Sequence, residues 1–235
     1  MAVHGFTQEI RSTVYGWYNR MMGRKPQRSP YLKYVFIGSG IVLASGILFF
    51  MYRWYVSYRE RAAQRVFAQY VTEYRRAYQQ GTGWGAVQDL FQLGADQQSG
   101  SYLQPYFLAF QADALLKEGK KDEALAVLDK VVASLRNNDP VAPLFKMKHA
   151  LLQIDMSDAA VQQVGVQSLI NLAHDETNKF RDAAQFFLGD YYWAQDNMSE
   201  AQNVWSALVQ SQHDIDMVAV SPWARQAQQK LAQIA

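Results

Sequence analysis

The chain has 235 residues, a formal net charge of +2 at pH 7 and no cysteine. Without cysteine it holds no disulfide, thiolate metal site or catalytic thiol, and its redox compartment stays undecided. Residues 81–235 carry 11 Lys and Arg against 18 Asp and Glu, a net charge of −7, so the basic residues gather toward the N-terminus. This acidic region argues against nucleic-acid binding, which needs clustered Lys and Arg on one face.

Residues 1–33 form a basic N-terminal tail. Six Lys and Arg residues stand against a single acid, Glu9, which gives the tail a net charge of +5. Apolar residues recur there at spacings of three and four, as in a helix that lies on a membrane surface: Phe6, Ile10, Val14, Trp17, Tyr18 and Met21. The alternative is an unstructured cytoplasmic tail. Pro26 and Pro30 interrupt the path into the next segment.

Residues 34–52 are a run of nineteen uncharged residues, which we interpret as a transmembrane helix. A helix of this length rises about 28 Å, close to the thickness of the hydrocarbon core of a bilayer. Aromatic residues, which favour the membrane interface, lie on both sides: Tyr31, Tyr34, Tyr52, Trp54, Tyr55 and Tyr58. A buried helix or strand of a soluble core is the alternative. Because 33 residues precede the run and bulky residues follow it, we expect a permanent anchor rather than a cleaved signal peptide.

The charges around residues 34–52 favour a cytoplasmic N-terminus and a periplasmic C-terminal domain, because the positive-inside rule retains basic tails in the cytoplasm. Four arginines on the other side reduce the asymmetry: Arg53, Arg59, Arg61 and Arg65. We expect basic residues beside the span to meet anionic lipid headgroups. Within the span, Gly40 and Ala44 form a small-x-x-x-small pair that predicts contact with another membrane helix.

Residues 53–80 contain no Gly or Pro and predict one long juxtamembrane helix. Its apolar residues fall on one stripe at helical spacing: Ala63, Val66, Phe67, Tyr70, Val71, Tyr74, Ala77 and Tyr78. Gly81, Gly83 and Gly85 end this helix. They lack the preceding strand and the Lys-Ser/Thr pair of a phosphate-binding loop, so we interpret them as a flexible turn.

Residues 81–235 predict an all-α domain of antiparallel helix pairs, because helical patterns alternate with short breaks and no convincing strand pattern occurs. The expected helices cover about 84–94, 102–118, 121–136, 140–154, 158–173, 178–195, 199–211 and 221–233. Start signals occur at three of them: Asp122-Glu123, Ser199-Glu200 and Ser221-Pro222. Gly119 and residues 137–140 mark turns.

The helix pairs carry a repeat that resembles the tetratricopeptide pattern of Leu-Gly-x-x-Tyr, then Ala, a large aromatic and a further apolar residue. The last pair fits with Leu188, Gly189, Tyr192, Ala201, Trp205 and Leu208. An earlier pair fits at the same offsets with Ala112, Leu115, Gly119, Ala124, Leu128 and Val131. Residues 140–173 supply a degenerate middle repeat, with Gly165 near the small-residue position. Small residues let paired helices approach closely, so we predict a tetratricopeptide-like α-solenoid, with a generic helical bundle as the alternative.

The complete layout resembles the YfgM-like proteins. The resemblance covers about residues 34–210: one span, a long juxtamembrane helix with Ala62, Ala63 and Tyr70, and a divergent tetratricopeptide-like domain. It implies a bacterial inner-membrane protein with a periplasmic domain, associated with the Sec translocon and with a membrane-anchored periplasmic chaperone of the prolyl-isomerase type. The implied role is non-catalytic: holding or handing on proteins that emerge across the membrane. The long tail, which lacks acidic character, departs from the family.

The sequence contains no catalytic constellation, and we expect no catalytic residue, metal, cofactor or enzymatic activity. The four histidines form no metal-ligand spacing: His4, His149, His174 and His213. We interpret His174-Asp175-Glu176 as electrostatics at a helix terminus. The glycosylation sequon at residues 197–199 is more simply a helix N-cap formed by Ser199.

The predicted function is that of a membrane-anchored protein–protein interaction module, with membrane lipid and other proteins as partners. The concave surface of tetratricopeptide-like solenoids takes up peptide segments, and Tyr anchors many protein interfaces. We predict that four residues approach that surface: Tyr106, Gln111, Asp190 and Tyr191. A cytoplasm-facing scaffold of a membrane assembly is the alternative. A helical enzyme would need a cleft of convergent polar groups, for which the sequence offers no candidates.

Overall fold

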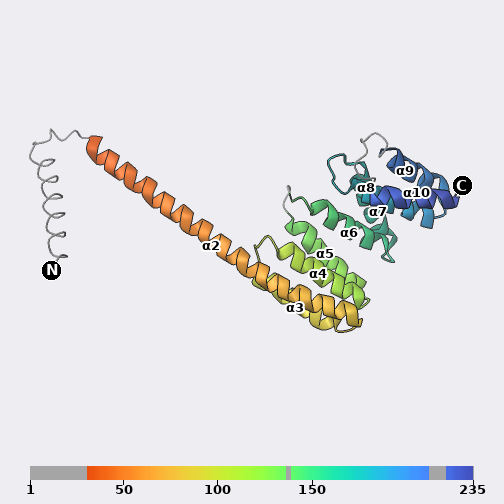
Figure 1. The fold of residues 1–235 in the computed structure, drawn as a ribbon, viewed down its shortest axis with the longest axis horizontal. Coiled ribbons are helices and arrows are strands. Elements are labelled where there is room, and N and C mark those ends of the chain that lie inside the picture. The colour runs from red at the N-terminus through yellow and green to blue at the C-terminus, as the bar shows by residue number, and fades with distance from the viewer. Residues whose placement is uncertain (1–30, 136–138, 212–220, 235) are drawn as a thin grey trace, which may run out of the picture. The chain divides into compact units, whose positions relative to one another are not determined.

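The computed structural model describes residues 31–135, 139–211 and 221–234, which form helices joined by turns, without a strand among them (Figure 1). With the labels of Figure 1, the helices are α2 (Tyr31–Gln80), α3 (Trp84–Gln97), α4 (Gln104–Lys117), α5 (Lys121–Ser134), α6 (Ala142–Ile154), α7 (Ala159–His174), α8 (Arg181–Ala194), α9 (Met198–Ser211) and α10 (Pro222–Ile234). The predicted all-α class is confirmed. Each helix predicted after residue 81 begins and ends within three residues of the observed one. The predicted amphipathic stretch at residues 6–21 lies outside the described residues.

Helix α2 contains the predicted span and the predicted juxtamembrane helix without a break. The chain divides into two compact units, Met1–Tyr58 and Arg59–Ala235, each described here by itself. In the first unit, the large apolar side chains from Ile41 to Phe50 are 60–74% exposed. By length and composition, α2 is the one helix of the described ranges that could cross a membrane. Within the described residues, none of its apolar stretch is buried, which agrees with a span better than with a soluble-core helix.

The second unit starts with an aromatic core between the end of α2, α3 and α4. The Phe67 ring of α2 meets Phe107 of α4 edge-on at 5.1 Å and Phe91 of α3 at 6.1 Å between ring centroids. Edge-to-face pairs of this kind add to the free energy gained by burying the rings. Most of the predicted apolar stripe of α2 is buried or packs on this core. Tyr78 is the exception, with 63% of its surface exposed.

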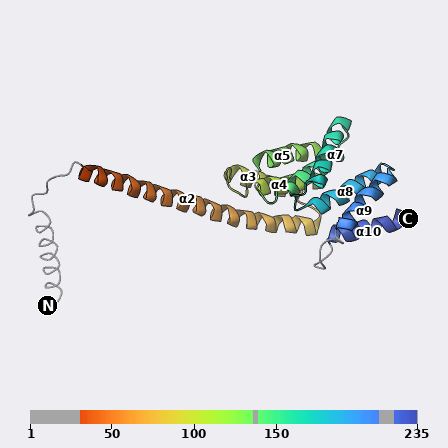
Figure 2. The same ribbon diagram turned by 90° about the horizontal axis from the view of Figure 1, so that it is seen from above.

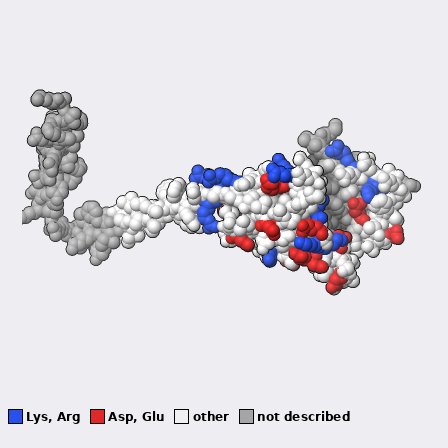
Figure 3. Space-filling view, turned by 90° about the horizontal axis from the view of Figure 1, so that it is seen from below, with Lys and Arg blue, Asp and Glu red and all other residues white. Residues whose placement is uncertain are grey.

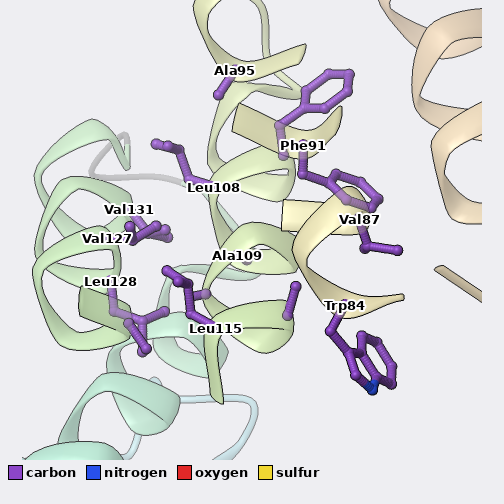
Figure 4. Packing of buried hydrophobic residues seen from close by; sticks show 14 of the residues in the cluster. Trp84, Val87, Phe91, Ala95, Leu108, Ala109, Leu115, Val127, Leu128 and Val131 are labelled. Carbon is purple, nitrogen blue, oxygen red and sulfur yellow. The ribbon is translucent and has the colours of Figure 1, made fainter. Parts of the chain in front are cut away.

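The core continues from α3 through α4 to α5. Figure 4 shows Trp84 and Phe91 on α3, Leu115 on α4 and Leu128 on α5, all part of one hydrophobic cluster. The residues predicted for the earlier repeat contribute to it: Ala112, Leu115, Ala124, Leu128 and Val131 are each at most 1% exposed. The predicted packing role of these positions is therefore confirmed.

The last repeat shows why its pattern needs a glycine. A Cβ atom built on Gly189 of α8 would lie 2.2 Å from Nε1 and 2.6 Å from Cδ1 of Trp205 on α9. The Trp205 ring is fully buried, and its Nε1–H donates a hydrogen bond of 3.1 Å to the carbonyl oxygen of Phe186. The indole thus occupies the space that a side chain at residue 189 would need. Figure 2 shows α8, α9 and α10 side by side, in agreement with their shared hydrophobic cluster.

In the middle repeat, Gly165 allows a similarly close contact between paired helices. A Cβ atom there would lie 2.7 Å from the carbonyl oxygen of Ala150 and 2.9 Å from the backbone nitrogen of Ile154. Helix α7 therefore approaches the backbone of α6 directly, as predicted for the small-residue position. Most predicted turn signals also hold, since Gly119 has a φ of 78° and α10 begins at Pro222.

One predicted cap is wrong. Helix α9 already begins at Met198, so Ser199 lies within it. The side-chain oxygen of Asn197 accepts hydrogen bonds from the Glu200 backbone nitrogen at 3.4 Å and from the Ser199 hydroxyl at 3.1 Å. Asn is as good an N-cap as Ser, and here it occupies the position just before the first helical residue.

Candidate protein-binding surface

Several first helices of the successive pairs pack against one another. We call this set the first-helix row: α2 from residue 59, α4, α6, α8 and α10. The Tyr106 ring of α4 lies 6.3 Å from Phe67 of α2 and 5.4 Å from Phe145 of α6. Farther along, Phe186 of α8 lies 5.5 Å from Trp223 of α10. Ring contacts thus link α2, α4 and α6 at one end of the row and α8 with α10 at the other. Repeat proteins bind extended segments on surfaces formed by successive helices of this kind.

Two ion pairs occupy equivalent places on this row. Asp113 of α4 pairs with Lys148 of α6, and Asp190 of α8 pairs with Lys230 of α10 at 3.1 Å between Nζ and Oδ1. Asp113 and Asp190 are separated by the same interval as the repeat residues Ala124 and Ala201. All four charged side chains are about one-third exposed or less. Each pair therefore links neighbouring first helices and still reaches the surface.

Lys230 has a second contact that fixes its position. Its Nζ lies 3.7 Å from the centroid of the Trp193 ring, a cation–π geometry. Within the described part of the chain, the buried Asp190 Oδ1 has no well-aligned hydrogen bond, so the nearby ammonium charge of Lys230 offsets its burial. The distance alone indicates an ion pair, and the poor alignment shows that it is not a strong hydrogen bond.

The row opens into a shallow groove near the end of α2. The groove has a volume of about 280 Å³ and is lined by Tyr74, Arg75, Tyr78 and Gln79. Nζ of Lys117, on α4, lies 5.4 Å from the centroid of the exposed Tyr78 ring. The surface offers stacking and cationic groups together, which suits aromatic or acidic side chains of a polypeptide.

Tyr74 is the lining residue of this groove with the most described ring contacts inside the domain. Its ring lies 4.9 Å from Phe110, edge-on. Burial raises the pKa of the Tyr74 phenol above its ordinary value of 10.0, with smaller contributions from the Asp113 carboxylate and from Tyr78. The hydroxyl is thus held neutral, as a donor or acceptor for hydrogen bonds rather than as a charge.

The four residues predicted to contact proteins lie on two helices of the row. Tyr106 is half-buried between Phe67 and Phe145, and Gln111 is 7% exposed, which leaves little of its side chain for a partner. On α8, Asp190 is engaged by Lys230, and Tyr191 is half-buried beside Tyr192. Their contact with other proteins stays a prediction.

The predicted membrane-helix contact also stays a prediction. Gly40 and Ala44 are exposed on the first unit, and a Cβ atom at Gly40 would meet nothing within 4 Å. The pair is therefore open to a neighbouring helix.

The two described histidines lie on different helices and each has one close polar partner. His149 Nε2 lies 2.7 Å from Oδ1 of Asp129, and His174 Nδ1 lies 2.8 Å from the carbonyl oxygen of Ile170 at the end of α7. No group of three or more His, Asp or Glu side chains in these ranges could hold a metal ion. His4 and His213 lie outside the described residues. At the start of α3, Gly81 and Gly83 have φ values of 70° and 85°, as expected for the predicted turn.

Comparison with solved structures identifies the architecture. A crystal structure of a putative kinesin light chain from Podosopora anserina, with nearly identical TPR-like repeats, aligns with a TM-score of 0.56 and 21% identity, over 73% of this chain and 86% of that chain. The crystal structure of a point variant of the same protein aligns with a TM-score of 0.57 and 21% identity, over 73% of this chain and 85% of that one. The fold is tetratricopeptide-like. No protein-family model and no curated protein matches the chain.

Three charged residues of the tetratricopeptide-like surface were not predicted from the sequence: Asp113, Lys148 and Lys230. Asp113 carried a usable signal, because it precedes Ala124 by the same interval that separates Asp190 from Ala201. Lys148 and Lys230 have no such signal in the sequence, since α6 and α10 lie outside the clear repeat pattern. Their roles follow only from the packing of neighbouring first helices.

Proposed function

We propose that this protein is a single-span membrane protein whose tetratricopeptide-like domain binds other polypeptides and catalyses no reaction. The observation that carries the proposal is the exposed apolar part of α2, which continues as one helix into the repeat domain. Fully burying a large apolar side chain is worth about 1.5–3 kcal/mol, so the seven from Ile41 to Phe50 forfeit on the order of 10 kcal/mol in water. A bilayer recovers this free energy.

The proposed location is a bacterial inner membrane, with the N-terminus in the cytoplasm and the repeat domain in the periplasm. The basic tail at residues 1–33 supports this orientation. The resemblance to the YfgM-like proteins supports the compartment and a role beside the Sec translocon and a membrane-anchored chaperone. On this proposal the domain receives polypeptides as they leave the membrane. A cytoplasm-facing scaffold is the alternative, which the arginines following the span favour.

The proposed binding surface is the first-helix row, with the groove at Tyr74 and Tyr78 as its most accessible part. Tyr78 combines exposure with two fixed neighbours, because its ring lies 6.5 Å from Tyr74 and 6.4 Å from Trp84. An aromatic ring that is already positioned loses little side-chain entropy when a partner binds. This makes Tyr78 a suitable anchor for a polypeptide.

Photo-crosslinking in native membranes tests the binding proposal. A photoreactive phenylalanine analogue at residue 78 should form adducts with other proteins, and the same analogue at Val164 on α7 is the matched control. Val164 is comparably exposed, at 55%, but belongs to the second helix of a pair. Adducts at residue 78 but not at residue 164 support the proposal. Equal yields at both positions, or none at residue 78, contradict it.

A further inference from the structure

The groove at the end of α2 is built on one side of that helix. Its lining residues form two pairs four residues apart, which places them side by side on the helix surface: Tyr74 with Tyr78, and Arg75 with Gln79. The two tyrosine rings are stacked, with planes inclined by 22° and centroids 6.5 Å apart. Trp84 of α3 meets both rings edge-on, at 5.4 and 6.4 Å between centroids. The rings are therefore held in place inside the repeat domain.

The size of the groove limits what it can hold. Its volume of about 280 Å³ is smaller than the ~300–1,000 Å³ of pockets that bind whole small molecules. A groove of this size suits one large side chain of a longer ligand. Aromatic rings pack favourably on other rings in stacked or edge-on geometry, so the two tyrosines favour an aromatic side chain.

Two exposed cationic side chains lie beside the rings. Arg75 lines the groove, and Nζ of Lys117 lies 5.4 Å from the centroid of the Tyr78 ring. Neither residue forms an ion pair with an acidic side chain of the described ranges. Both positive charges are therefore available to a ligand.

Acidic side chains near this part of the domain are already engaged by other cations: Glu73 pairs with Arg76, Glu118 with Lys120, and Asp113 with Lys148. On the face of the repeat domain drawn in Figure 3, many Lys and Arg side chains likewise lie beside Asp and Glu. The groove thus keeps two uncompensated positive charges, although residues 81–235 carry a net charge of −7. Charge complementarity favours an acidic ligand at this place.

We propose that the groove takes up an aromatic side chain flanked by acidic residues in an extended polypeptide. The aromatic ring would pack on Tyr78, and the flanking carboxylates would pair with Arg75 and Lys117. The Gln79 amide can exchange hydrogen bonds with the backbone of the same segment. The inference rests on the proposed function, and it adds the chemistry of the segment that binds.

Two photoreactive peptides test this inference with the full-length protein in a neutral detergent. The acidic peptide carries a photoreactive phenylalanine analogue between Asp and Glu in a Gly-Ser chain, and the basic peptide carries two lysines in place of the acids. Mass spectrometry locates the adducts. We expect the acidic peptide to label α2 beside Tyr74 and Tyr78 roughly tenfold more than the basic peptide, because two exposed ion pairs form with one and not with the other. The preference should fade at about 1 M NaCl, where charges are screened within about 3 Å.

Charge reversal gives a gain as well as a loss. The double variant Arg75→Glu with Lys117→Gln should prefer the basic peptide, and this gain also shows that the variant is folded. Arg225→Glu, at an exposed position of α10, is the matched control and should keep the preference for the acidic peptide. Tyr78→Ala should lower labelling by the acidic peptide about fivefold or more, because aromatic anchors carry much of the binding free energy of an interface.

The outcomes separate this inference from the proposed function. Equal labelling of the groove by both peptides, or an unchanged preference in the double variant, overturns the assignment to an acidic segment. Adducts located elsewhere on the first-helix row overturn the site and leave polypeptide binding in place. If neither peptide forms adducts, the inference is wrong, whereas the proposed function is decided separately by photo-crosslinking at residue 78 in native membranes.

Discussion

Replacing Gly189 by alanine removes the space that Trp205 occupies between α8 and α9. The new Cβ atom would lie 2.2 Å from Nε1 of the Trp205 ring, far inside van der Waals contact, so the ring must move. The ring is fully buried, and its shift also breaks the hydrogen bond to the Phe186 carbonyl oxygen.

The expected loss in the free energy of unfolding combines two destabilising effects and one stabilising effect. Overpacking a core costs about 1–3 kcal/mol, and the lost hydrogen bond costs about 0.5–1.5 kcal/mol. Alanine regains about 1 kcal/mol over glycine within a helix. The net change in the free energy of unfolding is therefore a loss of about 2 kcal/mol, which lowers a urea midpoint by about 1 M if m is about 2 kcal/mol per M.

Gly85→Ala in α3 is the matched control. Its Cβ atom would lie 3.0 Å from Oε1 of Glu118, the far end of a flexible side chain that can turn aside. We expect this variant to equal the wild type or to gain up to about 1 kcal/mol. Both variants are unfolded with urea as full-length protein in mild detergent, and helicity is followed by circular dichroism. A Gly189→Ala protein as stable as the Gly85→Ala protein would refute the packing argument.

Three further predictions concern other parts of the repeat domain. Gly165→Ala should lower the urea midpoint at least as much as Gly189→Ala, because its Cβ atom meets the backbone oxygen of Ala150, which cannot rotate away; an unchanged midpoint would contradict this. Since the pKa of Tyr74 is raised by burial, its contribution to stability is present below pH 10.0 and lost as the pH rises through the raised value. Tyr74→Phe should therefore reduce the alkaline loss of stability, and an identical alkaline profile would count against it. The Thr177 hydroxyl and backbone nitrogen, which donate hydrogen bonds to Asp175, lower the pKa of that carboxyl below 3.8. Its contribution is present above pH 3.8 and is lost as the pH falls through the lowered value, so Asp175→Ala should cost stability at neutral pH but not in acid, as urea titrations at both pH values can show.

Local spacing allowed the helices and the close contacts within each pair to be predicted. The interval from Gly189 to Trp205 places a small residue opposite a large one, and the structure shows the indole in that space. Helix ends were less accurate, because a cap depends on which side chain reaches the free backbone nitrogens, and Asn197 does so rather than Ser199.

Contacts between repeats could not be predicted from spacing. Tyr78 lies on the apolar stripe of α2, yet its side chain is exposed. The stripe could not predict this, because it does not show where the neighbouring helices end. The ion pair between Asp190 and Lys230 joins helices whose order in space is set by the stacking of the pairs. Contacts such as this ion pair can be identified only when the first helices are placed side by side.

Protease protection in spheroplasts, with a tag at the C-terminus, tests the central claim of a membrane-anchored domain on the periplasmic side. The tag should remain with the membrane fraction after alkaline extraction and should be digested by protease added outside. Protection until the membrane is permeabilised would reverse the orientation and favour the cytoplasmic scaffold. Release of the intact protein by alkaline extraction would contradict the membrane span itself.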